Sequence, residues 1–372
     1  METPRLHCPE TQAIKYTGSK LKLLSHILSF AERVRPRTVF DGFSGSTRVS
    51  QAFAQTGYRV YANDAAVYSK IFNTAWLLNK REPAMYQELV DHLNSLAPVD
   101  GWFTEYYGGE AGSPAVQNTG ALKFPWQKKN TRKLDAVREE IDRLDLDEVT
   151  KAVAICSLIL ALDQVDSTLG HFASYLNEWS PRSYRDLKLE VPRLWVNTQE
   201  NVVLHDDIFA AAQRLPPVDL AYLDPPYGSN NEKMPPSRIR YASYYHIWTT
   251  VCLNDKPELF GRVRRRSDSS DPLAASVFED FRRSPAGRFM AIEAIEKLVR
   301  EIPAEYILLS YSSGGRATAR ELHEVLNACG LVIACAEIDY RRHVMAAMKR
   351  TNDWVKDTEA KNIEFLFLVK KK

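Results

Sequence analysis

The feature that most constrains the fold of this chain is a strand–turn–helix–strand unit near its beginning. An apolar strand at residues 38–43 runs into a turn rich in glycine and serine, and a helix follows at about residues 47–56. Gly57 ends that helix, and residues 59–63 have the pattern of the next strand. This order of elements is typical of a parallel sheet that binds a nucleotide at the turn.

The remaining hydrophobic pattern predicts one α/β domain with a helical insertion. Apolar residues at helical spacing predict helices at residues 20–34, 82–96, 134–144 and 147–162. Further strands are expected at residues 201–204, 219–223, 306–311, 331–338 and 363–369, which gives about seven strands in all. We expect residues 1–79 and 200–372 to form the catalytic domain and residues 80–199 to form a target-recognition insertion. Loops are expected at residues 228–241 and 261–272.

Composition excludes several classes of protein. Of the 372 residues, 45% are hydrophobic and 26% charged, as in soluble globular proteins. The net charge of +2 does not by itself indicate a nucleic-acid partner. The N-terminus lacks a secretory pattern, and the longest apolar run, residues 152–162, is too short to span a bilayer. The five scattered cysteines match no zinc motif, so we expect no metal site, and reduced thiols in a cytoplasmic protein.

The most informative motif is the tetrapeptide Asp224-Pro225-Pro226-Tyr227. It directly follows the apolar residues 220–223, so it lies at the carboxyl end of a strand, where open α/β sheets bind ligands. An exocyclic aromatic amine is a poor nucleophile because its lone pair is delocalised, and the Asp224 carboxylate and Pro225 carbonyl could hold both of its hydrogens. The two prolines would keep that carbonyl aimed, and Tyr227 would offer a face for stacking an extruded base. The structural alternative is a strand end marked by prolines.

The turn after the first strand is a candidate cofactor site. Its sequence is FDGFSGST at residues 40–47, and the small residues around Gly45 would let the backbone approach a ligand closely. The helix that follows favours a negative group, such as a carboxylate, at its N-terminus. Asp64 ends the next strand about twenty residues on, where an acid can accept hydrogen bonds from ribose hydroxyls. Asp64 could equally cap a helix.

Two further segments are less informative when each is considered alone. KYTGSK at residues 15–20 has the pattern of a loop followed by the start of a helix. DDIF at residues 206–209 follows the third strand. An acid there could bind the amino group of an adenine nucleoside or cap the following helix, and the sequence leaves both open.

Taken together and in order, KYTGSK, DGFSGS, YAND, DDIF and DPPY resemble the Dam-type adenine-specific DNA methyltransferases. The segments YILLSYSS, EIDYRR and EFLFLVKK extend the resemblance toward the C-terminus, so that it covers most of the chain outside the insertion. The resemblance implies a class I methyltransferase fold, which is a Rossmann-like, mostly parallel α/β sheet of seven strands. It also implies that the protein uses S-adenosylmethionine and no metal.

Carried over residue by residue, the resemblance places four residues in the cofactor pocket: Tyr16, Lys20, Asp64 and Asp224. It implies that Asp224, Pro225 and Tyr227 hold the target base. With the turn and the third-strand acid added, the expected cofactor contacts are Tyr16, Lys20, Asp41, Gly45, Asp64, Asp207 and Asp224. The chain departs from the family at Thr47, which stands where the family's Phe-x-Gly-x-Gly turn has its second glycine.

Clusters of basic residues are candidate DNA contacts, because cationic side chains on phosphates give affinity that depends on salt and not on sequence. The first cluster follows the tetrapeptide and contains Arg262, Arg264, Arg265 and Arg266. The second contains Lys128 and Lys129 in the insertion, and the third contains Arg341 and Arg342. A solvated charged loop is the alternative for each. We expect the aromatic residues of the insertion to form local core, and His171 to have a structural or DNA-side role.

The sequence therefore predicts methyl transfer from S-adenosylmethionine to N6 of adenine in double-stranded DNA at a specific short site. A cognate restriction endonuclease is a conceivable partner. Methylation of cytosine N4 shares the amine chemistry, but Asp224 argues against it because that group more often has serine there. Methylation of adenine in RNA is a further alternative, since a single-stranded target costs less to present. A non-catalytic nucleic-acid-binding subunit would not need the intact motif, and a nicotinamide-dependent dehydrogenase would not explain DPPY.

Overall fold

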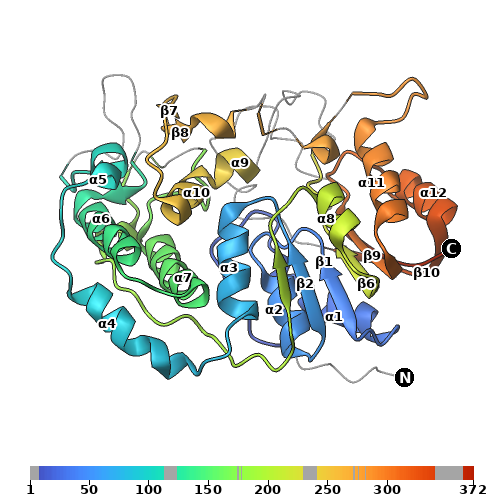
Figure 1. The fold of residues 1–372 in the computed structure, drawn as a ribbon. Coiled ribbons are helices and arrows are strands. Elements are labelled where there is room, and N and C mark those ends of the chain that lie inside the picture. Colours follow the sequence, from blue (N-terminus) through green and yellow to red (C-terminus); the bar gives the residue numbers. More distant parts are fainter. Residues whose placement is uncertain are drawn as a thin grey trace.

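A seven-stranded sheet forms the centre of the computed structural model (Figure 1), which describes residues 8–112, 124–173, 176, 178–228, 241–270, 273–274, 276–280, 282–339 and 363–372. The strands lie in the order β10-β11-β9-β6-β1-β2-β5. β11 is antiparallel to both of its neighbours, and the other neighbouring pairs are parallel. The bounds are β1 (Thr38–Asp41), β2 (Arg59–Asn63), β5 (Val202–Leu204), β6 (Val218–Leu223), β9 (Ala304–Ser312), β10 (Gly330–Asp339) and β11 (Ile363–Lys371). The predicted fold class is confirmed.

Helices cover both faces of this sheet. The 3-10 turn η1 (Lys20–Leu23), α1 (Leu24–Glu32) and α2 (Arg48–Gln55) pack on one face. α8 (Ile208–Arg214), α11 (Met290–Glu301) and α12 (Ala319–Cys329) pack on the other. Along β6, Leu220 and Tyr222 face the first group of helices, whereas Ala221 and Leu223 face the second. Strands buried on both faces have continuous apolar sequences, which is why the sequence pattern located them.

A helical body lies beside the sheet, with its own apolar core (Figure 1). It comprises η2 (Pro83–Tyr86), α4 (Gln87–Ser95), α5 (Trp102–Tyr107), α6 (Lys128–Arg143) and α7 (Glu148–Val165). α3 (Val67–Leu77) packs between it and the sheet. α10 (His246–Leu253), which follows the short helix α9 (Tyr241–Tyr244), joins the same core from the later part of the chain. The buried Arg138 of α6 fixes α10 there, because its guanidinium donates to the carbonyls of Val251 (2.6 Å) and Cys252 (3.0 Å).

The structure corrects two expectations about local structure. α6 begins at Lys128, although the pattern predicted a helix only from residue 134. Asn130 and Thr131 are buried in its first turns, and Asn130 Nδ2 donates to the Arg185 carbonyl at 2.9 Å, so the buried face is polar there and shows no apolar spacing. The expected loop at 261–272 contains β8 (Arg265–Arg266), paired antiparallel with β7 (Leu259–Phe260), and the 3-10 turn η4 (Ser267–Ser269). Of the other expected loop, residues 229–240 lie outside the described residues.

The five cysteines are all free thiols, and Cys156, Cys252 and Cys329 are buried. The helices within the described ranges are all too short or too polar to cross a membrane.

Candidate active site

A cavity of about 800 Å³ opens at the carboxyl ends of β1, β2 and β6. β1 lies between β2 and β6, where the order of strands along the sheet reverses, and open α/β sheets bind ligands at such a point. The structure brings all seven expected cofactor contacts to the wall of this cavity: Tyr16, Lys20, Asp41, Gly45, Asp64, Asp207 and Asp224. These residues come from segments far apart in the sequence, so the fold, and not local spacing, assembles the site.

The turn after β1 is held open by glycine geometry. Gly45 has a φ of +49°, and a Cβ there would lie 3.2 Å from the ring of Tyr16. The Gly45 amide donates to Asp64 Oδ2 at 2.7 Å, and Asp64 Oδ1 accepts from the Ala66 amide at 2.8 Å. Asp64 therefore ties the end of β2 to the glycine turn, and Ala66, not Asp64, is the N-cap residue of α3. Burial raises the pKa of Asp64.

Asp41 is a buried carboxylate with spare hydrogen-bonding capacity. Ser50 Oγ donates to Asp41 Oδ2 at 2.5 Å, whereas Oδ1 has no hydrogen-bond partner among the described residues. Burial raises the pKa of Asp41 to about 7, and the nearby charges of Asp224 and Asp64 add to that effect. A buried acceptor without a partner is costly, so a donor group on a ligand in this cavity would be stabilising.

Asp224 lies within a buried polar cluster at the end of β6. Lys20 Nζ is 3.0 Å from Asp224 Oδ2 and 3.1 Å from Glu364 Oε1 on β11. The Tyr227 hydroxyl donates to Asp224 Oδ1 or to Glu364 Oε1, which is 2.6 Å away, and accepts from Lys20 Nζ at 2.8 Å. One ammonium thus lies between two carboxylates and a phenol.

Charges within this cluster influence one another. Burial raises the pKa of Asp224 to about 6, with Lys20 opposing the rise and Glu364 adding to it. Burial alone would lower the pKa of Lys20, but the two carboxylates outweigh it and raise that pKa. Asp224 is therefore an ionised acceptor near neutral pH and a protonated carboxyl below about pH 6.

The rest of the tetrapeptide is divided between the cavity wall and the core. Pro226 lines the cavity with Asp224, whereas Pro225 and Tyr227 are not among the described residues that line it. The Tyr227 ring packs on Tyr311 with centroids 4.7 Å apart, and its carbonyl accepts from the Arg316 amide at 2.8 Å.

Residues outside the predicted set complete the site. Tyr16 stacks on Tyr245 with centroids 4.6 Å apart and on Tyr241 at 5.5 Å, and the Tyr245 hydroxyl accepts from the Thr17 amide at 2.7 Å. Glu364 also lies outside the predicted set, although a glutamate at the start of an apolar strand is a usable signal, since charged residues are seldom buried unless paired.

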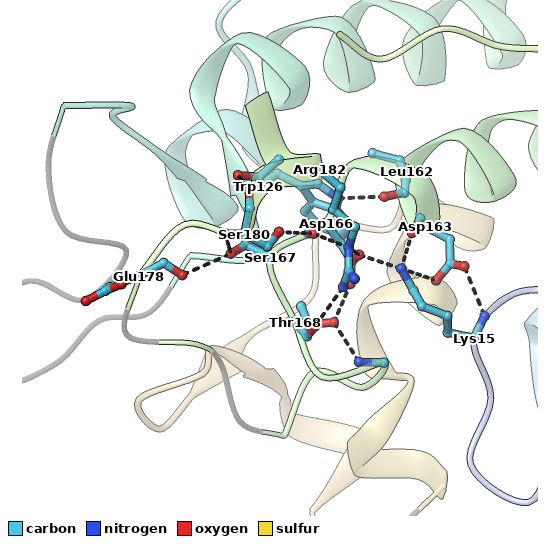
Figure 2. A network of polar contacts seen from close by, with 12 residues as sticks. Lys15, Trp126, Leu162, Asp163, Asp166, Ser167, Thr168, Glu178, Ser180 and Arg182 are labelled. Carbon is cyan, nitrogen blue, oxygen red and sulfur yellow. Dashed lines mark hydrogen bonds and ion pairs between the residues drawn. The ribbon is translucent and has the colours of Figure 1, made fainter. Parts of the chain in front are cut away.

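A polar network ties the segment before Tyr16 to the end of α7 (Figure 2). The Lys15 amide donates to Asp163 Oδ2 at 2.9 Å, and Lys15 Nζ lies 2.6 Å from Asp166 Oδ1. Asp166 is buried, and the same oxygen accepts from Arg182 Nε at 2.8 Å, while its other oxygen accepts from Thr168. The helical body therefore fixes the backbone next to a residue of the cavity wall.

For Asp207 the sequence left two roles open, a helix cap and a ligand contact, and its position is compatible with both. Its side chain caps α8 by accepting from the Phe209 amide at 2.9 Å, and it also lines the cavity. Its neighbour Asp206 forms an ion pair with Arg214.

The predicted DNA contacts have very different surroundings. Arg266 is only 3% exposed and pairs with Asp255 and Asp268, each at 2.7 Å, so its charge is already balanced inside the protein. Arg264 lies over the rings of Tyr106 and Phe124, and Arg265 over that of Phe260. Arg262 is exposed.

The other candidate contacts lie elsewhere on the molecule. Lys128 and Lys129 lie at the start of α6 and form exposed ion pairs with Glu110 (3.2 Å) and Asp186 (2.6 Å). Arg341 and Arg342 lie outside the described residues. His171 is buried and stacks on Tyr244 with centroids 4.3 Å apart.

Four of the five aromatic residues that the sequence placed in local core pack in the core of the helical body, whereas Trp179 is half-buried and is not among the residues of that core. Tyr107 and Trp126 are fully buried there, and Trp102 and Tyr106 pack against them.

Comparisons with known proteins give one matching family model and several relatives. The sequence model of the D12 class N6 adenine-specific DNA methyltransferases matches residues 16–277. The modification methylase StsI of Streptococcus sanguinis is 25% identical, and the alignment covers 89% of this chain and 49% of StsI. The type II methyltransferase M.NlaIII of Neisseria lactamica is 23% identical over 96% of this chain and 99% of its own length. M.FokI of Planomicrobium okeanokoites is 24% identical, and this chain spans about half of it (47%).

Proposed function

Because the chain belongs to the D12 class N6 adenine-specific DNA methyltransferases, we propose that it transfers a methyl group from S-adenosylmethionine to N6 of adenine at a specific site in double-stranded DNA. One observation carries the proposal. The Asp224 carboxylate, which can hold an exocyclic amine, lines the same cavity as the glycine turn and Asp64. A volume of about 800 Å³ is within the range of small-molecule and cofactor sites.

The residues present fit S-adenosylmethionine. Asp64 would accept hydrogen bonds from the ribose hydroxyls, and Asp207, which lines the same cavity, would accept from the adenine amino group. The free acceptor Asp41 Oδ1 suits the ammonium group of the methionine moiety, and the turn at Gly45 leaves room for a close approach. When bound, S-adenosylmethionine supplies an electrophilic methyl group on a positively charged sulfur.

The chain's own groups would orient the target amine. Asp224 Oδ1 would accept one amino hydrogen and the Pro225 carbonyl the other, which localises the nitrogen lone pair for attack. The base must leave the helix stack to reach this edge of the sheet, at a cost of a few kcal/mol. In our proposal, stacking against the tetrapeptide, including Tyr227, and contacts with phosphates offset that cost. The surplus proton of the methylated amine leaves after transfer, through Asp224 or water.

Among the basic residues, we propose the exposed ones as contacts to DNA phosphates. Arg262 and the two lysines at the start of α6 are exposed or half exposed and are our candidates. The internal ion pairs of Arg266 favour a structural role for that residue. Relatives named as modification methylases and type II methyltransferases support a cognate restriction endonuclease as a partner of the system.

The test is expression of the chain in a host without DNA methylation, followed by long-read sequencing scored for modified bases. We expect N6-methyladenine at one recurrent short motif. Methylated cytosine N4 would retain the amine chemistry and overturn the base assignment. Unmodified DNA from a well-expressed protein that binds S-adenosylhomocysteine would overturn the DNA assignment and favour an RNA substrate.

A further inference from the structure

Glu364 brings a second carboxylate to Asp224 from a part of the chain that the family model does not cover. The model matches residues 16–277, whereas Glu364 lies near the start of β11. Its side chain is 7% exposed. Its Oε1 atom lies 3.1 Å from Lys20 Nζ, 2.6 Å from the Tyr227 hydroxyl and 3.1 Å from Ser310 Oγ. A buried carboxylate held by three donors has a defined position.

The Tyr227 hydroxyl has one hydrogen but two carboxylates within reach. It can donate to Asp224 Oδ1 or to Glu364 Oε1, but not to both at full strength. Its oxygen already accepts from Lys20. Lys20 also occupies Asp224 Oδ2 at 3.0 Å, so Oδ1 is the Asp224 oxygen that a target base would use. When the hydroxyl donates to Asp224, it competes with the base for that oxygen.

We propose that Glu364 is a positioning residue, which accepts the Tyr227 hydroxyl hydrogen and so leaves Asp224 Oδ1 available to the amino group of the target adenine. The inference rests on the proposed function and adds a residue to the same site. No covalent bond changes, because one hydrogen bond moves from one carboxylate to another. Because both acceptors are negatively charged, moving the Tyr227 hydrogen bond between them costs little free energy. A neutral acceptor in place of Glu364 would bind the hydroxyl hydrogen less strongly than Asp224 does.

The electrostatics of the cluster favour this arrangement. The groups that face Asp224 are Lys20, Glu364 and Tyr227, with Tyr222 and Asp41 nearby. After burial, Lys20 lowers and Glu364 raises the pKa of Asp224. Removal of the Glu364 charge therefore lowers the pKa of Asp224, and the acid limb of the pH–rate profile shifts to lower pH.

The experiment combines Glu364→Gln with Tyr227→Phe in the full chain. Glu364→Gln alone is expected to lower kcat about tenfold or more, with little change in the affinity for S-adenosylhomocysteine measured by calorimetry. In the Tyr227→Phe background no hydroxyl competes for Asp224, so adding Glu364→Gln should cost no more than about twofold. A residue with only a structural role would give the same loss in both backgrounds.

Two further variants complete the design. Glu364→Asp keeps the charge but withdraws it from Tyr227, so it should behave as Glu364→Gln does in kcat without the pH shift. Glu337→Gln on β10 is the control, because Glu337 is exposed and its backbone lies opposite Phe365. Equal losses from Glu364→Gln with and without the tyrosine hydroxyl would overturn the proposal. Failure of the wild-type protein to methylate adenine would overturn both this inference and the proposed function, whereas additive losses in an active enzyme would overturn this inference alone.

Discussion

At the scale of single residues, the site is dominated by carboxylates that the fold has buried. Asp41, Asp64 and Asp224 all line one cavity, and burial raises the pKa of each. The sequence predicted all three, since each lies at or just after the end of an apolar strand. It could not predict their partners, because Ser50, Lys20 and Glu364 reach them only through the fold.

Asp41 gives a prediction about stability and pH. Its pKa rises from 3.8 to about 7 on folding, so its contribution to stability is present in full below pH 4 and is lost as the pH rises toward 7. At pH 8 the free energy of unfolding of Asp41→Asn should therefore be about 1–3 kcal/mol higher than that of the wild type. The variant should also unfold at a higher temperature. Calorimetry of the ligand-free proteins at pH 5 and pH 8 tests this, and an asparagine variant that is less stable at pH 8 would contradict it.

Asp224 gives a prediction about turnover. Asp224→Ala should reduce methylation at least about a hundredfold, because one acceptor for the amine is lost, while circular dichroism and the melting temperature show an intact fold. In the wild type, kcat should fall as the pH drops below about 6, where the carboxyl is protonated. Asp91→Ala, an exposed change on α4, is the control. Normal turnover by Asp224→Ala would refute the proposed mechanism.

At the scale of elements, the central strands were predictable and the irregular segments were not. The strands of the sheet coincide with runs or alternations of apolar residues, so their positions follow from the sequence. The start of α6 was missed because its buried residues there are polar. The hairpin of β7 and β8 was missed because its arginines resemble a solvated loop, although one of them is buried between two aspartates. The family's glycine preference at position 47 is also explained, since Thr47 has a φ of +66°.

The network at the end of α7 predicts a link between the helical body and cofactor binding (Figure 2). Lys15→Met removes the ion pairs with Asp163 and Asp166, so that the Lys15 amide bond to Asp163 alone would tie this segment to the end of α7. We expect the dissociation constant for S-adenosylhomocysteine to rise about threefold to tenfold, equivalent to roughly 1 kcal/mol. Lys80→Met, which breaks an exposed pair with Glu200 at 3.0 Å, is the matched control and should have no effect on binding. Equal affinities for both variants would exclude the link.

At the scale of the whole molecule, helices that precede the tetrapeptide in the sequence and a helix that follows it share one apolar core. α10 packs with α6 and α7, although the sheet strands β5 and β6 lie between them in the sequence. Sequence periodicity does not show which helices share a core, so the expected insertion of residues 80–199 did not include α10. The hairpin of β7 and β8 packs against α10. As a result Arg266 is buried, whereas Arg262, only a few residues earlier in the chain, is exposed.

That contrast predicts different consequences for two similar substitutions. Arg262→Ala should weaken binding to all DNA sequences alike and reduce the salt dependence of binding by about one ion, with no change in melting temperature. Arg266→Ala removes a buried side chain and leaves the partly exposed Asp255 and Asp268 without their partner, so it should destabilise the fold by about 1–3 kcal/mol. Salt titrations of DNA binding and thermal denaturation separate the two effects. Loss of DNA affinity in Arg266→Ala at full stability would reverse the assignment.

The contacts of Lys20 with Asp224 and Glu364 join segments that are made at different times during translation. The ribosome releases residue 20 early and residue 364 late, and a domain generally folds as a unit. If Glu364 has its proposed role, the nascent chain reaches full activity only after β11 has entered the sheet beside β9. Products of translation interrupted before residue 364 would lack both this carboxylate and a buried strand of the sheet, so activity would report that the polypeptide has been made through β11.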